Sequence, residues 1–386
     1  MNAKDGVQEH IRRSEAALID LSHRIHGHPE LGFEEERAVG WLADSLDAQG
    51  FRVERGICDL PTAFMARAGS GPLEIAICAE YDCLPDIGHA CGHNLIAAIA
   101  VGAAASLARV ADDVGLTIRI IGTPAEEGGG GKILMLERGA FDGVHAAMMV
   151  HPAPLDMAEP PIIAFTEFDV HYTGKASHAS AAPERGINAA DALTVAQTAI
   201  GLLRQHICPT DRIHGIVTRG GEAPNVIPAR TSGRWVVRAS SVNDLADVRA
   251  KVMRCFEAGA VATGCTMEVQ DTGAPYAEML HDGAMAALYQ RNAEALGRYF
   301  PDLGRSIERL AASTDMGNVS QVIPSIHPMI GIASLPAVNH QPEFAAHCAT
   351  PPADKAVLDG ATALAWTAID LASDDTLSAR LRARTA

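Results

Sequence analysis

Six side chains suited to acid–base or metal chemistry follow directly after strand-like apolar runs. The runs are LEIAICAEYD, GLTIRIIGT and VHAAMMVHP. The side chains are Asp82, Cys91, His93, Glu126, Glu127 and His151. In open α/β sheets, ligands bind beyond the carboxyl ends of the strands. We therefore expect these six side chains to gather at one rim of a sheet.

These residue types suit a metal centre. Thiolate and imidazole favour zinc and its borderline neighbours, and a carboxylate adds a harder oxygen ligand. The adjacent Glu126 and Glu127 can divide the work, because one can bind metal while the other takes a proton from the attacking water. The glycine run 128–131 keeps side chains out of the pocket and permits a tight turn.

The segment GGGGKI is not a phosphate-binding loop. In the P-loop spacing, the first glycine would fall on Glu126, and Ile133 stands where serine or threonine is required. The two glutamates would also repel a phosphate.

Strand-like and helical patterns alternate around these motifs. We expect strands at 73–82, 115–123 and 144–152, and helices from about 95 and at 132–141. This alternation predicts an α/β sheet that is largely parallel and covered by helices.

A proline-rich stretch at 152–161 then marks a change of pattern. The following segment reads as strand, helix, two strands, helix and strand, a β-α-β-β-α-β unit. We expect an α+β domain at 166–273, inserted into a discontinuous α/β domain formed by 1–165 and 274–386.

Charge and composition limit the partners. The formal net charge is −16, which disfavours nucleic acid and anionic membrane. The first residues have no apolar signal core, and the run 95–107 is too short to span a bilayer. The 8 cysteines show no framework spacing, which predicts reduced thiols and a cytoplasmic location.

The motifs in order along the chain resemble one known family. They are AEYDCLPDIGHACGHN, GTPAEEGGGGK, MVHP, GKASHAS, PNVIPA, STDMGNVS and NHQPEF. Together they resemble the aminoacylase and carboxypeptidase G metallopeptidases, peptidase family M-twenty. The amidohydrolase branch is the most similar, with p-aminobenzoyl-glutamate hydrolase, auxin-conjugate hydrolase and β-alanyl dipeptidase-like proteins.

The resemblance implies two divalent metal ions, zinc or manganese. By matching position, five residues are the expected ligands: Cys91, His93, Glu127, His151 and His340. Glu126 matches the family's general base, and Asp82 matches an aspartate that supports the ligands.

The inserted domain resembles the family's lid and dimerisation domain, which implies a homodimer. His178 matches a histidine that reaches the site of the partner subunit and polarises the scissile carbonyl. Asn225 and Thr314 match positions bordering the substrate. Arg238 matches an arginine that binds a substrate carboxylate, and a surface charge on a strand explains it equally well.

The chain departs from the family at some positions. Glu80 stands where many relatives have His or Asp and is not assigned to the metal, while Asn94 replaces a common Asp. The segment DTGAPYAEM lacks an arginine found in the carboxypeptidase G branch, and His89 has no matched role.

We therefore expect a metal-dependent amidohydrolase acting on a small N-acyl amino acid or an aminobenzoyl-glutamate-like conjugate. The alternative substrate is an unusual dipeptide, such as a β-alanyl dipeptide. Two other functions remain open from the sequence: a thiol hydrolase with Cys91 as nucleophile and His93 as base, and a binding protein without catalysis.

Overall fold

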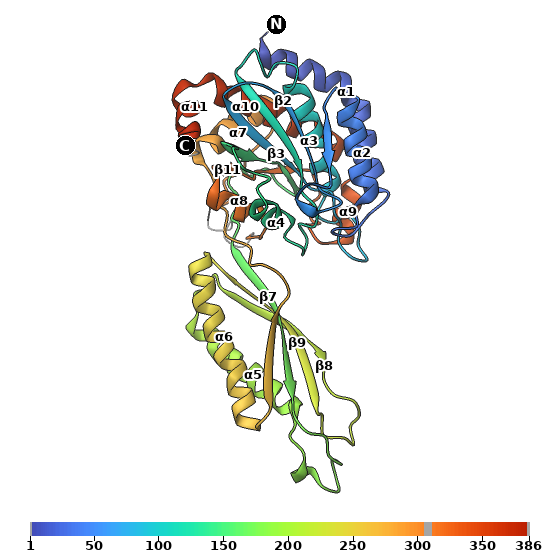
Figure 1. Cartoon of the computed structure of the whole chain (residues 1–386), viewed down its shortest axis with the longest axis vertical. Helices are drawn as coiled ribbons and strands as arrows, with labels where there is room; N and C mark the ends of the chain where they lie inside the picture. Colours follow the sequence, from blue (N-terminus) through green and yellow to red (C-terminus); the bar gives the residue numbers. More distant parts are fainter. Residues whose placement is uncertain (1, 305–310, 384–386) are drawn as a thin grey trace. The chain divides into compact units, whose positions relative to one another are not determined.

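The computed structural model describes residues 2–304 and 311–383, which form two compact units. The first unit contains residues up to Pro161 and from Met279 onward, and the second contains Ile162–Glu278. The first unit therefore has a discontinuous chain (Figure 1). No helix in the described ranges has the length and apolarity needed to cross a membrane.

The first unit is built around a six-stranded sheet with the order β1-β2-β4-β3-β5-β11. Its strands are β1 (Val53–Arg55), β2 (Phe64–Gly69), β3 (Leu73–Ala79), β4 (Leu116–Gly122), β5 (Ala146–Met148) and β11 (Ser325–Ile326). β3 pairs in parallel with both β4 and β5, and β11 extends the parallel part. β2 is antiparallel to β4. β3 is buried along its whole length, as expected for a strand covered on both faces.

Helices cover this sheet. They are α1 (Ala3–His26), α2 (Glu36–Asp47), α3 (His93–Leu107), α4 (Gly131–Glu137), α7 (Gly283–Ala295), α8 (Met316–Val322), α9 (Pro342–His347), α10 (Pro351–Ser373) and α11 (Asp375–Arg382). α3 is entirely buried because α1 and α10 pack against it while it lies on β3 and β4. Its small side chains permit this close approach, and a methyl group at Gly102 would lie 2.9 Å from Leu18.

The expected strand at 144–152 is two strands. β5 ends at Met148 within the large sheet, and β6 (His151–Ala153) pairs in parallel with β12 (Met329–Gly331) in a separate two-stranded sheet. The backbone N–H of His151 donates to the carbonyl of Pro328, which draws the chain away from β3. The continuous apolar run hid this break, because both strands are buried.

The second unit has the element order β7 (Ala164–Thr173), α5 (Ala189–Leu203), β8 (Arg212–Arg219), β9 (Arg230–Ala239), α6 (Val242–Thr263) and β10 (Thr266–Asp271). Its four strands form an antiparallel sheet with the order β10-β7-β9-β8. α5 and α6 lie side by side along this sheet (Figure 1). Phe168, Trp235 and Phe256 pack in its own hydrophobic core. The chain as a whole has the mixed α/β fold that the sequence pattern predicts.

Candidate metal centre

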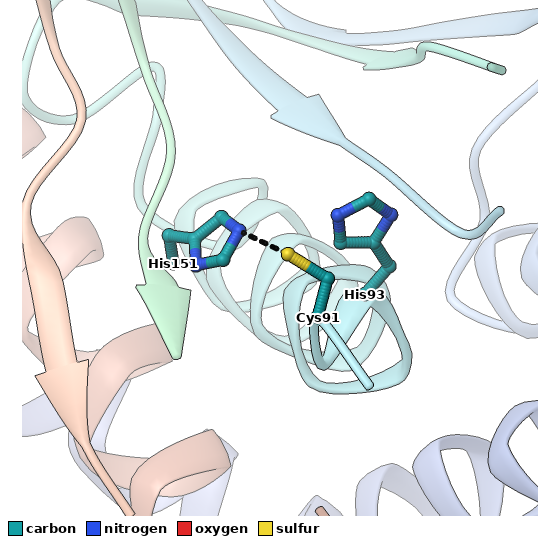
Figure 2. A group of neighbouring side chains, drawn as sticks. All are labelled: Cys91, His93 and His151. Atoms are coloured by element: carbon teal, nitrogen blue, oxygen red, sulfur yellow. Dashed lines mark hydrogen bonds between the residues drawn. The ribbon is translucent and has the colours of Figure 1, made fainter. Parts of the chain in front are cut away.

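Cys91, His93 and His151 converge at one end of the large sheet. Cys91 and His93 lie at the start of α3, and His151 opens β6 (Figure 2). The Cys91 Sγ is 3.5 Å from the His151 Nε2. One ligand atom from each of the three lies within 4.8 Å of the others. All three side chains are buried.

Two carboxylates and a distant histidine extend this cluster. The Glu127 Oε1 lies 3.7 Å from the His93 Nε2 and 3.5 Å from the His340 Nε2. The Glu126 Oε2 lies 3.9 Å from the same nitrogen of His93. His340 comes from the other end of the chain, and its backbone N–H donates to the carbonyl of Ala90. Its φ of 68° is unusual for a residue with a side chain.

Hydrogen bonds fix the orientation of two imidazoles. The His93 Nδ1 donates to the Asp82 Oδ1 at 2.9 Å, and the His151 Nδ1 donates to the carbonyl of Pro152 at 2.8 Å. In both rings the Nε2 is then the nitrogen that faces the cluster. This is the arrangement in which a histidine binds metal while a carboxylate or carbonyl holds its other nitrogen.

The donor set fits divalent metal ions. Among the described residues, buried side-chain atoms without a hydrogen-bond partner include the His93 Nε2, the Glu127 Oε1 and the Glu80 Oε2. Buried polar atoms without a partner call for an explanation, and a metal ion bound among these atoms would supply one. Two ligands of a tetrahedral zinc ion lie about 3.4 Å apart. The 3.5 Å separations at Cys91–His151 and Glu127–His340 are close to this value.

The electrostatic environment separates the two neighbouring glutamates. Burial, with the Glu80 and Glu127 carboxylates, raises the pKa of Glu126 well above its usual range. Burial also acts on Glu127, but the neighbouring His340 imidazole and the charge of His93 outweigh it and lower the pKa of that carboxyl. Glu126 thus has the stronger affinity for a proton, and Glu127 is the better anionic ligand.

The pKa values of Cys91 and His93 are both raised, but burial acts on the two groups in opposite directions. Burial and the Glu127 charge raise the pKa of the Cys91 thiol well above its usual range. For His93, burial lowers the pKa, but the Asp82 carboxylate more than offsets this and leaves it well above the usual value. Without a cation beside it, Cys91 is a protonated thiol and a poor nucleophile.

A buried ionic cluster that the sequence interpretation missed lies beside this centre. The Lys132 ammonium contacts the Glu80 Oε1 at 2.5 Å and the Asp315 Oδ1 at 2.7 Å, and all three side chains are fully buried. The other oxygen of Glu80 lies 3.5 Å from the His93 Nε2. The signal in the sequence was the lysine that ends GGGGK, since an apolar helix start rarely contains a lysine unless it is paired.

The remaining predicted residues are not members of these groups of ligand atoms. Thr314 is buried next to Asp315, and its hydroxyl accepts the N–H of Met316 at the start of α8. In the second unit, the His178 side chain is exposed, and its backbone forms an isolated antiparallel β-bridge with Val226. The neighbouring Asn225 accepts the N–H of Ala179 with its backbone carbonyl. Arg238 lies on β9 with its guanidinium 4.9 Å from the Phe165 ring centre.

Two further motif positions have structural roles. Asn94 donates to the Ser22 hydroxyl and to the carbonyl of Cys348, so it ties α3 to its surroundings. His89 stacks on His26 with ring centres 6.2 Å apart, and burial lowers its pKa to about 3.

Comparison with known proteins decides the family. The sequence pattern of Peptidase family M20/M25/M40 matches residues 77–364. The chain belongs to this family. A mouse (Mus musculus) Xaa-Arg dipeptidase is 38% identical over 382 residues, which cover 95% of this chain and 88% of that protein. One of the Escherichia coli p-aminobenzoyl-glutamate hydrolase subunits is 33% identical, over 68% of this chain and 59% of that protein.

Solved structures show the same fold. A Bacillus subtilis protein described as a dinuclear metal binding peptidase has a TM-score of 0.71 at 22% identity, over 93% of this chain and 99% of that one. A Staphylococcus aureus protein described as an aminohydrolase reaches a TM-score of 0.77 at 22% identity, over 95% and 99% of the two chains. This member of the family is a metal-dependent hydrolase of amide bonds.

Proposed function

We propose that this enzyme cleaves dipeptides and related N-acyl amino acids at a centre of two divalent metal ions, zinc or manganese. The three overlapping groups of ligand atoms around His93, Glu127 and Cys91 carry this proposal, because one ion cannot use all of them. Cys91, His93, Glu127, His151 and His340 would hold the ions. When bound, the ions supply positive charge that activates water and polarises the amide carbonyl.

Glu126 is the proposed proton carrier. Its side chain is buried and its pKa is raised. It belongs to the group of ligand atoms with His93 and Glu127, and the other two groups do not include it. Its carboxylate takes a proton from the attacking water as the oxygen bonds to the carbonyl carbon. Glu126 then gives that proton to the amide nitrogen as the C–N bond breaks. The products are a carboxylic acid and an amine, which after transfer of the remaining proton are a carboxylate and an ammonium group.

The second unit is proposed to act as a lid and as the dimer contact. In this role, His178 donates a hydrogen bond to the carbonyl oxygen as negative charge develops there. Asn225, Arg238 and Thr314 would contact the remainder of the substrate. His178 and Asn225 lie on adjoining segments, which supports a shared function.

A dipeptide is the favoured substrate over an aminobenzoyl-glutamate conjugate. The similarity to the mouse Xaa-Arg dipeptidase covers 95% of this chain, second unit included, whereas the similarity to the aminobenzoyl-glutamate hydrolase covers 68%. The net charge of −16 has the sign that attracts a cationic substrate. We therefore propose dipeptides with a C-terminal arginine or lysine.

A turnover screen of metal-loaded enzyme tests this function. The panel contains dipeptides with basic, neutral and acidic C-terminal residues, N-acetyl amino acids and p-aminobenzoyl-glutamate. We expect the highest kcat/KM for the basic dipeptides and none after chelation. Preference for p-aminobenzoyl-glutamate would refute the substrate assignment, and full activity of Glu126→Gln would refute the mechanism.

A further inference from the structure

The residue before Glu126 has a conformation that requires outside support. Ala125 has a φ of 56°, in the left-handed region where residues with a Cβ are disfavoured. Such a conformation persists only where the surroundings hold it, and it tends to occur at functional sites. Ala125 is also buried, so solvent does not hold it.

A buried carboxylate from the N-terminal part of the chain supplies this support. The Ala125 N–H donates to the Glu35 Oε1 at 2.8 Å. Glu35 has no exposed surface and lies immediately before α2. Burial of a carboxylate costs free energy unless hydrogen bonds replace its lost hydration, and the Ala125 N–H supplies one such bond.

The segment 32–35 and Gly129 pack closely around Ala125. A Cβ at Gly32 would lie 2.8 Å from the Ala125 Cβ and 2.9 Å from its Cα. A Cβ at Gly129 would lie 2.6 Å from the Ala125 Cβ and 2.5 Å from the Phe33 ring. Both positions therefore require glycine, and Ala125 fills the space between them.

A second carboxylate holds the other side of Glu126. The Glu127 N–H donates to the Asp82 Oδ2 at 3.0 Å. The backbone amides on both sides of Glu126 within Ala125–Glu127 are thus fixed by buried carboxylates from distant segments. A side chain between two such anchors has little freedom of direction, which is what a proton carrier requires.

We propose that Glu35 is a positioning residue for Glu126: it holds Ala125 in its left-handed conformation and thereby aims the Glu126 carboxylate. The inference rests on the proposed role of Glu126. Glu35 lies outside the matched residues 77–364, so the working site extends beyond the part of the chain that defines the family.

Steady-state kinetics of two Glu35 variants test the inference. Glu35→Ala removes the acceptor, and we expect kcat to fall about 10- to 100-fold, with KM and metal stoichiometry unchanged. Glu35→Gln keeps a carbonyl oxygen for the Ala125 N–H, and we expect kcat within about threefold of wild type. Unchanged kcat in Glu35→Ala, or loss of bound metal in place of kcat, would overturn the inference.

Two further variants serve as partner and control. Gly32→Ala pushes on Ala125 from the opposite side, and we expect the same loss of kcat, which keeps the test decisive if Glu35→Ala does not fold. Glu30→Ala removes a carboxylate in the same loop that accepts the N–H groups of Arg37 and Ala38. We expect Glu30→Ala to lower the melting temperature and leave kcat unchanged. A normal kcat in Gly32→Ala would contradict the inference.

Parallel measurement of Glu126→Gln separates the two proposals. If Glu126→Gln is inactive and Glu35→Ala is fully active, only the role of Glu35 is refuted. If Glu126→Gln retains full activity, the mechanism is refuted and the role of Glu35 with it.

Discussion

The Asp82 carboxylate joins His93 to Glu127, because one oxygen accepts the His93 Nδ1–H at 2.9 Å and the other accepts the Glu127 backbone N–H at 3.0 Å. Asp82 is buried. A single aspartate therefore sets the direction of an imidazole and of a carboxylate in the cluster.

Replacing Asp82 is expected to weaken metal binding. In Asp82→Asn, one amide oxygen can still accept a hydrogen bond, but the NH₂ group opposes the second N–H. We expect metal affinity to fall about 10- to 100-fold, measured by titration calorimetry or competition with a chelator. The control is Asp112→Asn, since Asp112 caps Ser70 far from the cluster. Wild-type affinity in Asp82→Asn would contradict the assigned role.

Loss of Lys132 is expected to destabilise the fold. Lys132→Met leaves the buried Glu80 and Asp315 without their cation, which costs about 3–5 kcal/mol and is measurable by denaturant unfolding. The matched control is Lys355→Met, where an exposed lysine pairs with Asp359 one helical turn away. We expect a change within about 0.5 kcal/mol there. Equal effects in both variants would show that the buried cluster has no special importance.

Thiol alkylation distinguishes a metal ligand from a nucleophile. Cys208 is exposed and Cys91 is buried with a raised pKa. With iodoacetamide at about neutral pH and saturating metal, we expect peptide mapping to find Cys208 labelled and Cys91 unlabelled, with activity retained. Rapid labelling of Cys91 with loss of activity would favour a thiol hydrolase. Cys208→Ser removes the background signal.

The stability of the protein is expected to carry a pH signature of Glu35. Burial raises the pKa of this carboxyl in the folded state above the ordinary value of 4.5. Above that ordinary value, the folded state binds more protons than the unfolded state, so this group makes stability fall as pH rises toward its folded pKa. Glu35→Gln removes that contribution. We expect the melting temperature of the variant to decline less steeply with rising pH than that of the wild type. Parallel curves of melting temperature against pH for the two proteins would contradict this expectation.

Subunit mixing tests the proposed lid. If His178 completes the site of a partner subunit, inactive Glu126→Gln and inactive His178→Ala should regain activity when unfolded and refolded together. One site of the mixed dimer then has both residues. Each variant refolded alone is the control, and no recovery in the mixture would place His178 outside the partner's site.

Much of the arrangement follows from strand pattern. The apolar runs ending near Asp82, Thr123 and His151 form β3, β4 and the β5–β6 segment, and parallel strands deliver their following loops to one edge. Cys91, His93 and His151 can be expected together on this ground alone.

Other parts of the centre depend on tertiary contacts without a local pattern. The approach of His340 to Glu127 requires a left-handed backbone at His340, which its residue type does not indicate. The Glu35–Ala125 hydrogen bond joins a loop before α2 to a loop after β4, and the string of glutamates in GFEEER reads as a solvated surface. The periodicity of apolar residues predicts which face of a strand or helix is buried, but it does not predict which loops come into contact.

The discontinuous first unit has a consequence for synthesis of the enzyme. His340 contributes to the cluster only after the whole second unit and most of the C-terminal segment have been translated, because its backbone pairs with Ala90. A nascent chain on the ribosome thus displays Cys91, His93, Glu127 and His151 long before the last partner arrives. We therefore expect the proposed metal centre to be completed, and hydrolytic activity to begin, only after the segment that contains His340 has emerged from the ribosome.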